Sequence, residues 1–388
     1  MHALLTAFLG LYLSHLLTDF VLQSDRMIAD KRRSSAWAYA GHGAVHFFSA
    51  ALFLGFAIPG LALRWSFYAY ILGLVLVHLI IDWLKIRLVR SETLADGAPA
   101  FLGDQAIHAL TVFLTAWLIF VYFPFVHMVW SPDGLFARMG VLDFAGGIVV
   151  HTTAGFAALA SVIFVGRRCD STDAPHNVPL MALGAGLLWF GWFGFNAGSE
   201  VGVDWVTVSS FVNTQLGAAF AGCTWLVLEW ANVRRPNFVG LMTGAVAGLA
   251  AITPAAGYVS FGIASVIGFS AGLVCYYAVT IKKVFGWDDA LDVWGVHGVG
   301  GVLGAILLGV FAAKSWNPHG AAGLLSGGTR FFLWQCIAVV ASAAWAFAFS
   351  YAALWLINCV TLVRVDAETE NLGLDAGLLG EAAYSEDR

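Results

Sequence analysis

Long apolar stretches separated by short polar segments run through the whole chain of 388 residues. A helix that crosses a bilayer needs about 20 mostly apolar residues, and only helices satisfy the backbone of a single stretch in lipid. The pattern therefore predicts an all-α, multi-pass membrane protein with about eleven transmembrane helices. They are expected near residues 3–22, 38–60, 66–88, 105–129, 142–166, 178–197, 207–230, 237–256, 259–280, 293–313 and 330–359.

Two of these stretches carry a histidine in a glycine-rich setting, LDFAGGIVVHTTAGFAALA around His151 and LDVWGVHGVGGVLGAILLG around His297. A glycine follows each histidine after four positions (Gly155 and Gly301), and a small residue follows after seven (Ala158 and Gly304). Ionisable side chains inside a membrane helix are costly and indicate function. The repetition predicts one structural element built twice, with the two histidines facing each other in a shared site.

Composition and charge define the class and the orientation. With 60% hydrophobic and 11% charged residues, the chain is expected in a bilayer, and no nucleic-acid partner is expected. Lys and Arg concentrate on the cytoplasmic side of membrane proteins. An outer N-terminus and an inner C-terminus place all but four of the 19 Lys and Arg residues inside, the exceptions being Arg64, Arg138, Lys314 and Arg330. We expect a multi-pass protein of the cell membrane, as in a bacterial inner membrane.

From about residue 122 to the end, several motifs carry a specific resemblance. They are FVHMVW (125–130), LDFAGGIVVH (142–151), PHNVPL (175–180), GWFGFNAGS (191–199), TPAAGY (253–258), DVWGVHGVGG (292–301) and ENLGLDAGLLGEAAY (370–384). This part of the chain resembles the Amt/Rh/Mep family of ammonium transporters. The resemblance implies a homotrimer, each protomer having its own pore between two inverted five-helix repeats, a common transporter arrangement.

The resemblance also implies roles for individual residues in binding ammonium and ammonia. It assigns ammonium recruitment at the outer mouth to Trp130 and Ser199, capping of the pore to Phe195, the pore itself to His151 and His297, and a buried acid near the recruitment site to Asp143. Each residue alone has a simpler interpretation. Trp130 could be an ordinary interfacial tryptophan, and Asp143 could cap the helix that follows it.

The first part of the chain departs from this family. Residues 1–104 take the place of three family helices, among them the one with the partner of Phe195, and resemble a small family of uncharacterised bacterial membrane proteins. The helix at 105–129 looks composite. We therefore expect an N-terminal three-helix unit (1–104), a transporter domain (105–364) and an acidic cytoplasmic tail (365–388).

The N-terminal segment and the start of the composite helix have polar positions of their own. Four pairs are spaced i, i+4, so that each pair shares one helix face: His15 with Asp19, His42 with His46, His78 with Asp82, and Asp104 with His108. Facing histidines and carboxylates in a helix bundle can hold a divalent metal such as zinc, iron or manganese. A hydrogen-bonded polar lining that only orients the helices is the alternative.

Two functions from different classes remain open. The first is an ammonium channel or transporter, which is no enzyme and needs no cofactor for transport. The second is an intramembrane metal-binding or hydrolytic module joined to a non-conducting transporter remnant, and a chimera of two genes is a third possibility. The tail resembles the family segment that docks a PII-type signal protein, although Leu379 stands where the family often has histidine.

Overall fold

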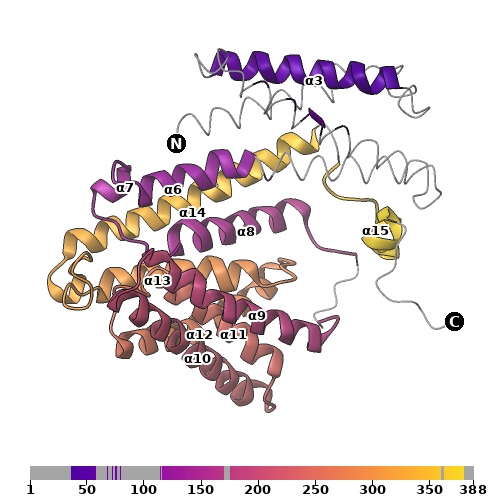
Figure 1. Ribbon diagram of the computed structural model, residues 1–388. Helices are drawn as coiled ribbons and strands as arrows, with labels where there is room; N and C mark the ends of the chain where they lie inside the picture. The colour runs from indigo at the N-terminus through magenta and orange to yellow at the C-terminus, as the bar shows by residue number, and fades with distance from the viewer. Residues whose placement is uncertain are drawn as a thin grey trace. The chain divides into compact units, whose positions relative to one another are not determined.

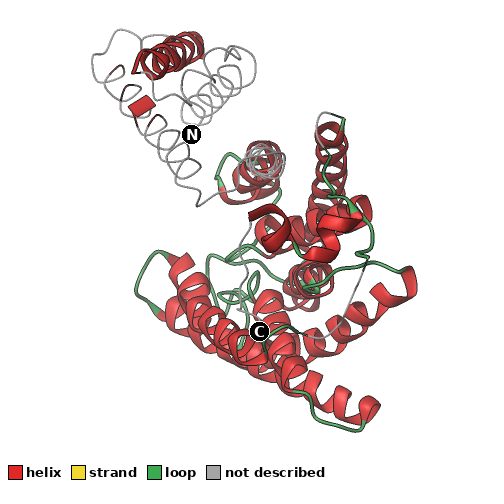
Figure 2. Ribbon diagram, turned by 90° about the vertical axis from the view of Figure 1, so that its right-hand side faces the viewer, coloured by secondary structure: helices red, strands yellow, loops and turns green. Residues whose placement is uncertain are grey.

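The computed structural model describes residues 36–57, 68, 72, 75, 76, 79, 114, 116–169, 175–359 and 362–379. The chain divides into two compact units, one formed by Met1–Ile107 with Leu372–Arg388 and one by His108–Asn371. Every regular element in the described ranges is a helix, as Figure 2 shows in red. The expected all-α class is therefore confirmed.

In the first unit, helix α3 spans Ala36–Ala57, close to the predicted stretch at 38–60. Gly43 lies against this unit's Leu79, whose Cδ1 would be 2.9 Å from a Cβ at that position. The predicted helix at 3–22 and most of the one at 66–88 lie outside the described residues.

In the second unit, a helix lies at each predicted stretch from residue 142 onward (Figure 1). Its elements are η3 (Leu118–Tyr122), α6 (Phe123–Trp130), α7 (Leu135–Arg138), η4 (Gly147–Thr152), α8 (Thr153–Val165), α9 (Val178–Ala197), η5 (Gly198–Glu200), α10 (Trp205–Val233), α11 (Phe238–Ile252), α12 (Phe261–Phe285), η6 (Trp294–Gly298), α13 (Val299–Phe311), η7 (Leu324–Ser326) and α14 (Thr329–Asn358). The tail contains α15 (Ala367–Leu372) and η8 (Asp375–Leu379).

Seven helical segments in the described ranges are long and apolar enough to cross a membrane. Helix α11 is shorter than its predicted stretch at 237–256, because the chain leaves the helix at Ile252 and turns through 253–258. That turn lets the Pro254 carbonyl accept a hydrogen bond of 3.1 Å from the Phe144 amide. The chain is a multi-pass membrane protein.

Polar side chains start several of these helices. Asp204 accepts a hydrogen bond from the Thr207 amide at the start of α10, and Asn237 accepts one from the Val239 amide at the start of α11. Such caps satisfy N–H groups that have no partner within the helix. Local sequence thus defines where the helices begin.

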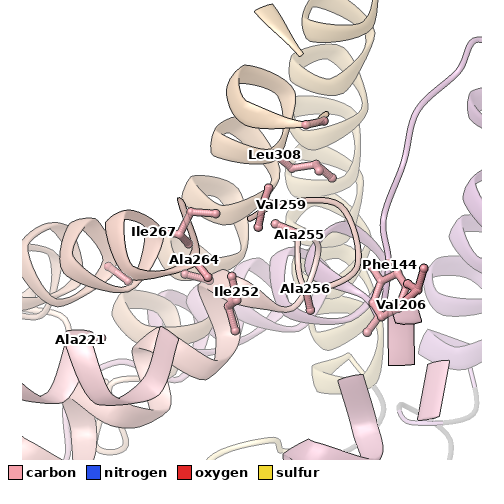
Figure 3. Packing of buried hydrophobic residues seen from close by; sticks show 14 of the residues in the cluster. Phe144, Val206, Ala221, Ile252, Ala255, Ala256, Val259, Ala264, Ile267 and Leu308 are labelled. Atoms are coloured by element: carbon pink, nitrogen blue, oxygen red, sulfur yellow. The ribbon is translucent and has the colours of Figure 1, made fainter. Parts of the chain in front are cut away.

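Small residues hold the centre of the second unit together. Gly217 of α10 lies between two glycines of neighbouring helices: a Cβ at Gly248 of α11 would be 2.2 Å from its carbonyl oxygen, and one at Gly268 of α12 would be 2.5 Å from it. Close backbone approach of this kind is typical of packing in membranes. Beside it, Phe144, Ile252, Val259, Ile267 and Leu308 belong to one buried apolar cluster (Figure 3).

Candidate functional site

The two histidines lie in two elements of the same design. Each begins as a π-helical segment that contains the histidine, η4 for His151 and η6 for His297, and continues as an α-helix of 13 residues, α8 or α13. A buried aspartate precedes each histidine by eight positions, Asp143 in the first element and Asp289 in the second. The predicted duplication therefore extends to helix type and length.

Both aspartates bind the start of the helix that follows. The Asp143 carboxylate accepts four backbone hydrogen bonds, from the amides of Gly146, Gly147, Ile148 and Val149, at 2.6–3.0 Å. Asp289 accepts two, from Val293 at 3.1 Å and Trp294 at 2.9 Å. A carboxylate at the positive end of a helix is stabilising, so both side chains hold the histidine-bearing segments in place.

Glycines let the two elements cross at the histidines. A Cβ at Gly155, one turn after His151, would lie 2.1 Å from the Gly298 Cα. A Cβ at Gly301, one turn after His297, would lie 2.7 Å from the Gly147 carbonyl oxygen and 2.8 Å from the His151 Cβ. The glycines singled out in the sequence thus make reciprocal contacts, each with the other element.

The crossing brings the two imidazoles together. Their Nδ1 atoms are 3.3 Å apart, within hydrogen-bond distance, and the ring centroids are 5.3 Å apart with planes inclined by 20°. One ring nitrogen must donate and the other accept, so the contact holds a single proton. The His151 Nε2 atom is buried and has no hydrogen-bond partner in the described part of the chain.

Aromatic rings of α9 cover the histidine pair. Trp192 stacks on both imidazoles, at 5.3 Å from the His151 centroid and 6.4 Å from that of His297. The Trp192 indole N–H donates a hydrogen bond of 2.9 Å to the Thr253 hydroxyl, which holds the ring in place. Phe195 lies one turn further along α9, 6.1 Å from the His151 ring, and remains 42% exposed.

The two residues expected to recruit ammonium lie at helix ends. Trp130 ends α6, is 40% exposed, and donates its indole N–H to the Asp143 carbonyl oxygen at 2.7 Å. Ser199 is exposed in η5, and its hydroxyl donates to the Phe195 carbonyl oxygen at 2.8 Å. Trp130 thereby connects to the His151 element, and Ser199 connects to Phe195.

A cavity of about 1240 Å³ opens on the other side of the pair. His297 lines it together with parts of α9, α10, α11 and α12, and its wall includes Arg167, Arg168, Lys282 and Lys283. Ion pairs bind two of these basic residues to the loop before η6, Arg168 to Asp288 at 2.6 Å and Lys282 to Asp292. The histidine pair therefore lies between the aromatic cover and a polar vestibule, which we call the basic vestibule.

The tail contacts a loop at this end of the second unit. Arg364 forms an ion pair with Glu370 at 2.9 Å and also donates to the Val165 carbonyl oxygen at the end of α8. Glu370 in turn accepts a 2.6 Å hydrogen bond from the Cys169 amide. These contacts hold the pKa of Glu370 below its ordinary value, because the Cys169 amide and the Arg364 guanidinium both stabilise the charged form.

Of the eight residues predicted to bind metal, the structure describes two. His42 and His46 are both buried on α3, with ring centroids 4.6 Å apart in an edge-on arrangement. No group of three metal-binding side chains occurs in the described ranges. The other six positions, His15, Asp19, His78, Asp82, Asp104 and His108, lie outside them.

Two residues of the site were missed by the sequence analysis. Asp289 could have been found, since it stands eight positions before His297 as Asp143 stands eight before His151. Trp192 had no such signal, because the chain contains 16 tryptophans and a tryptophan in an apolar helix is ordinary.

Comparisons with known proteins show which families the two parts of the chain match. The model of the Ammonium Transporter Family matches residues 100–384, and that of a protein of unknown function (DUF3307) matches residues 5–136. An ammonium transporter of Aquifex aeolicus is 45% identical over 294 residues, covering 76% of this chain and 69% of that protein. The overlap of the two models at 100–136 contains the helix that we expected to be composite.

Solved structures match as well. Mep2 of Candida albicans is 31% identical with a TM-score of 0.67, covering 82% of this chain and 72% of that one. A structure described as a sensor Amt protein is 34% identical with a TM-score of 0.61, covering 69% of each chain. This chain spans about two thirds of the length of these relatives. Over most of its length, this chain belongs to the ammonium transporter family.

Proposed function

We propose that this chain moves ammonium across a membrane along a path that passes Trp130, Phe195 and the histidine pair and ends in the basic vestibule. The observation that carries the proposal is the 3.3 Å contact between the Nδ1 atoms of His151 and His297, made by two duplicated elements that cross at glycines. A pair of imidazoles packed among apolar and aromatic side chains has the chemistry to pass a small polar molecule and a proton.

Recruitment uses the exposed face of Trp130. An aromatic face attracts a cation by about 0.5–2 kcal/mol, the larger value applying where water is excluded. The hydrogen bond from its indole N–H to Asp143 fixes the orientation of the ring. Ser199 supplies a hydroxyl oxygen that can accept an N–H bond from ammonium. Asp143 acts by positioning, since its carboxylate accepts four backbone N–H groups of η4.

Past Phe195 the ion has to lose its charge. Burial of an unpaired cation among apolar groups is costly, and the described walls here are Phe195, Trp192 and the two imidazoles. Ammonium gives its proton to the Nε2 atom of His151 and crosses this part as ammonia. The proton between the two Nδ1 atoms then moves from His151 to His297. His297 releases its Nε2 proton into the basic vestibule, where ammonia takes up a proton again. The free Nε2 of His151 is the nitrogen that ammonium meets.

We also propose the orientation and the partners. Arg167, Arg168, Lys282 and Lys283 line the basic vestibule, so this side is cytoplasmic by the distribution of Lys and Arg, with the N-terminus outside and the C-terminus inside. The membrane is a bacterial inner membrane and the assembly a homotrimer, as the family resemblance implies. The tail docks a PII-type signal protein at the vestibule side.

A test is growth on limiting ammonium in cells that lack their own ammonium transporters. The intact chain is expected to restore growth and His151→Ala to abolish the rescue. His319→Ala, an exposed histidine outside the pair, is the matched control and should behave as the intact chain. Equal growth with His151→Ala at equal membrane abundance would contradict the proposal. The absence of rescue by the intact chain would favour the non-conducting alternative.

A second candidate function concerns the N-terminal unit. The buried edge-on contact of His42 and His46 brings two imidazoles together on α3. We propose that these side chains take part in binding a divalent metal, together with the His and Asp pairs at other positions of the first 108 residues. Purified full-length protein should carry metal in a one-to-one ratio, and His42→Ala with His46→Ala should remove it. Full-length protein without metal would overturn this candidate.

A further inference from the structure

Glu229 is an acidic side chain at the wall of the basic vestibule that the transport path described above does not use. It lies on α10, one turn after Trp225, and i, i+4 spacing puts both on one face of that helix. Trp225 and Glu229 both line the cavity that begins at His297. A ligand leaving the histidine pair on this side therefore enters the space that Glu229 borders.

The Glu229 carboxylate is poorly satisfied by the protein. Its Oε2 atom is buried and has no hydrogen-bond partner in the described ranges, and its Oε1 atom accepts only a long bond of 3.4 Å from the Asn237 amide. The other two carboxylates of the vestibule, Asp288 and Asp292, are ion-paired. A carboxylate is an acceptor only, and a buried acceptor without a donor is unfavourable, the more so when it is charged.

Two residues of the neighbouring helix α11 and its cap keep the Glu229 carboxylate in place. A Cβ at Gly240 of α11 would lie 1.9 Å from Oε2, so only glycine leaves room for it. The Asn237 side chain is itself fixed, because its carbonyl oxygen caps α11 through the Val239 amide at 2.9 Å while its NH₂ group points to Glu229. Two features of α11, a small residue and a fixed amide, thus support one acidic side chain.

We propose that the Glu229 carboxylate is a binding site for ammonium in the basic vestibule, where the ion collects on the side opposite Trp130. The ligand is a small cation with several N–H donors, which supplies the donor that the carboxylate lacks. The site lies on the same cavity as His297. At that end of the path it can therefore supply ammonium for transport or receive ammonium after transport. This inference rests on the proposed transport function.

The first test measures transport from each side separately, with full-length protein in oriented proteoliposomes and ammonium applied to one face. Glu229→Gln keeps the size of the side chain and removes its charge. Loss of a charged hydrogen bond is expected to raise the half-saturating ammonium concentration about tenfold on the vestibule side, and to leave it unchanged on the Trp130 side. Glu368→Gln, an exposed acid of α15, is the matched control and should change neither value.

A purely structural defect would alter the half-saturating concentration on both sides or the amount of folded protein. Equal half-saturating concentrations for Glu229→Gln and the intact chain on the vestibule side would overturn the inference.

The second test does not depend on transport. Infrared difference spectra of the detergent-solubilised full chain should show a carboxylate band that shifts with ammonium chloride and is missing in Glu229→Gln. A similar shift with sodium chloride, or none with either salt, would overturn the assignment to ammonium. An intact chain that transports from neither side would refute the proposed function alone, while the infrared result would still decide the site.

Discussion

Asp143 and Asp289 occupy equivalent positions but accept different numbers of backbone hydrogen bonds. The carboxylate of Asp143 accepts four backbone N–H groups in a buried setting, whereas that of Asp289 accepts two. Each of these groups would otherwise lack an acceptor at the start of a helix. Each aspartate therefore caps the start of its helix and, in doing so, orients the histidine eight residues later.

We expect Asp143→Ala to destabilise the protein more than Asp289→Ala. Loss of a cap costs about 0.5–2 kcal/mol, and burial of N–H groups without acceptors adds to that cost, so we expect about 2–4 kcal/mol for Asp143 and about 1–2 kcal/mol for Asp289. Thermal unfolding of the detergent-solubilised protein measures the difference. Asp204→Ala, which removes an exposed cap of α10, is the control and should cost about 1 kcal/mol. Equal effects at Asp143 and Asp204 would contradict this account.

At the level of elements, the site depends on two helices that cross with almost no space between them. Gly155 faces Gly298, and Gly301 faces Gly147 and His151. In lipid there is little hydrophobic drive between helices, so close backbone contact supplies the stabilisation. The distance between the imidazoles is therefore set by the absence of side chains one turn away.

Gly155→Ala should separate these elements and reduce ammonium flux. The new Cβ would lie 2.1 Å from the Gly298 Cα, a backbone atom that cannot move out of the way by a rotamer change. Overpacking of this kind costs about 1–3 kcal/mol. Flux into proteoliposomes, normalised to folded protein, is expected to fall by an order of magnitude or more, since the imidazoles lose their contact.

Gly191→Ala is the matched control on α9, where nothing lies within 4 Å of the added Cβ. Alanine is the better helix former by about 1 kcal/mol, so stability should stay the same or rise and flux should not change. Equal flux in the Gly155→Ala and Gly191→Ala variants would show that transport does not depend on the close crossing of the two elements.

At the scale of the whole second unit, ion pairs at the basic vestibule connect loops that are distant in sequence. Arg168, after α8, binds Asp288, before η6, with two side-chain hydrogen bonds of 2.6 and 2.8 Å. The Arg364–Glu370 pair connects the tail to the end of α8 and to Cys169. The two histidine-bearing elements and the tail are thus linked outside the apolar core.

The Arg168–Asp288 pair should respond to acid. Hydrogen bonding to the Arg168 guanidinium lowers the pKa of Asp288 from 3.8 to about 2. Because the folded-state pKa is lower than the unfolded one, the stabilisation is complete above pH 4 and is lost as the pH falls towards 2. Protection of the loop at Arg167 and Arg168 from proteolysis by an acid-stable protease should decrease over this range. Asp288→Asn should show weak protection at every pH; an unchanged acid profile in that variant would refute the assignment.

Release of the tail is the second expectation at this scale. Glu370→Gln removes the charge that Arg364 binds and weakens the acceptor for the Cys169 amide. An exposed ion pair contributes little to global stability, so the unfolding temperature should hardly change. The mobility of a spin label on the tail should increase, whereas Glu368→Gln, on the same short helix, should leave it unchanged. A tail that stays immobile in Glu370→Gln would mean that other contacts hold it.

Much of this protein followed from the sequence, although not all of the site. The apolar stretches predicted the helices from residue 142 onward. The duplicated setting of His151 and His297 predicted that they belong together. The stacking of Trp192 on both rings and the enclosure of Glu229 by Gly240 were not predictable, because neither residue departs from what its own helix commonly contains.

The sequence predicted some features and not others because these features depend on interactions of different range along the chain. In a bilayer, the apolar length and the caps of a helix are local, so the sequence by itself determined the class, the helices and the polar exceptions within them. The contact between His151 and His297 joins positions 146 residues apart, and it depends on how two helices cross. Only the tertiary structure decided that these imidazoles share a proton, that Trp192 covers them, and that the vestibule beyond His297 contains an unsatisfied carboxylate.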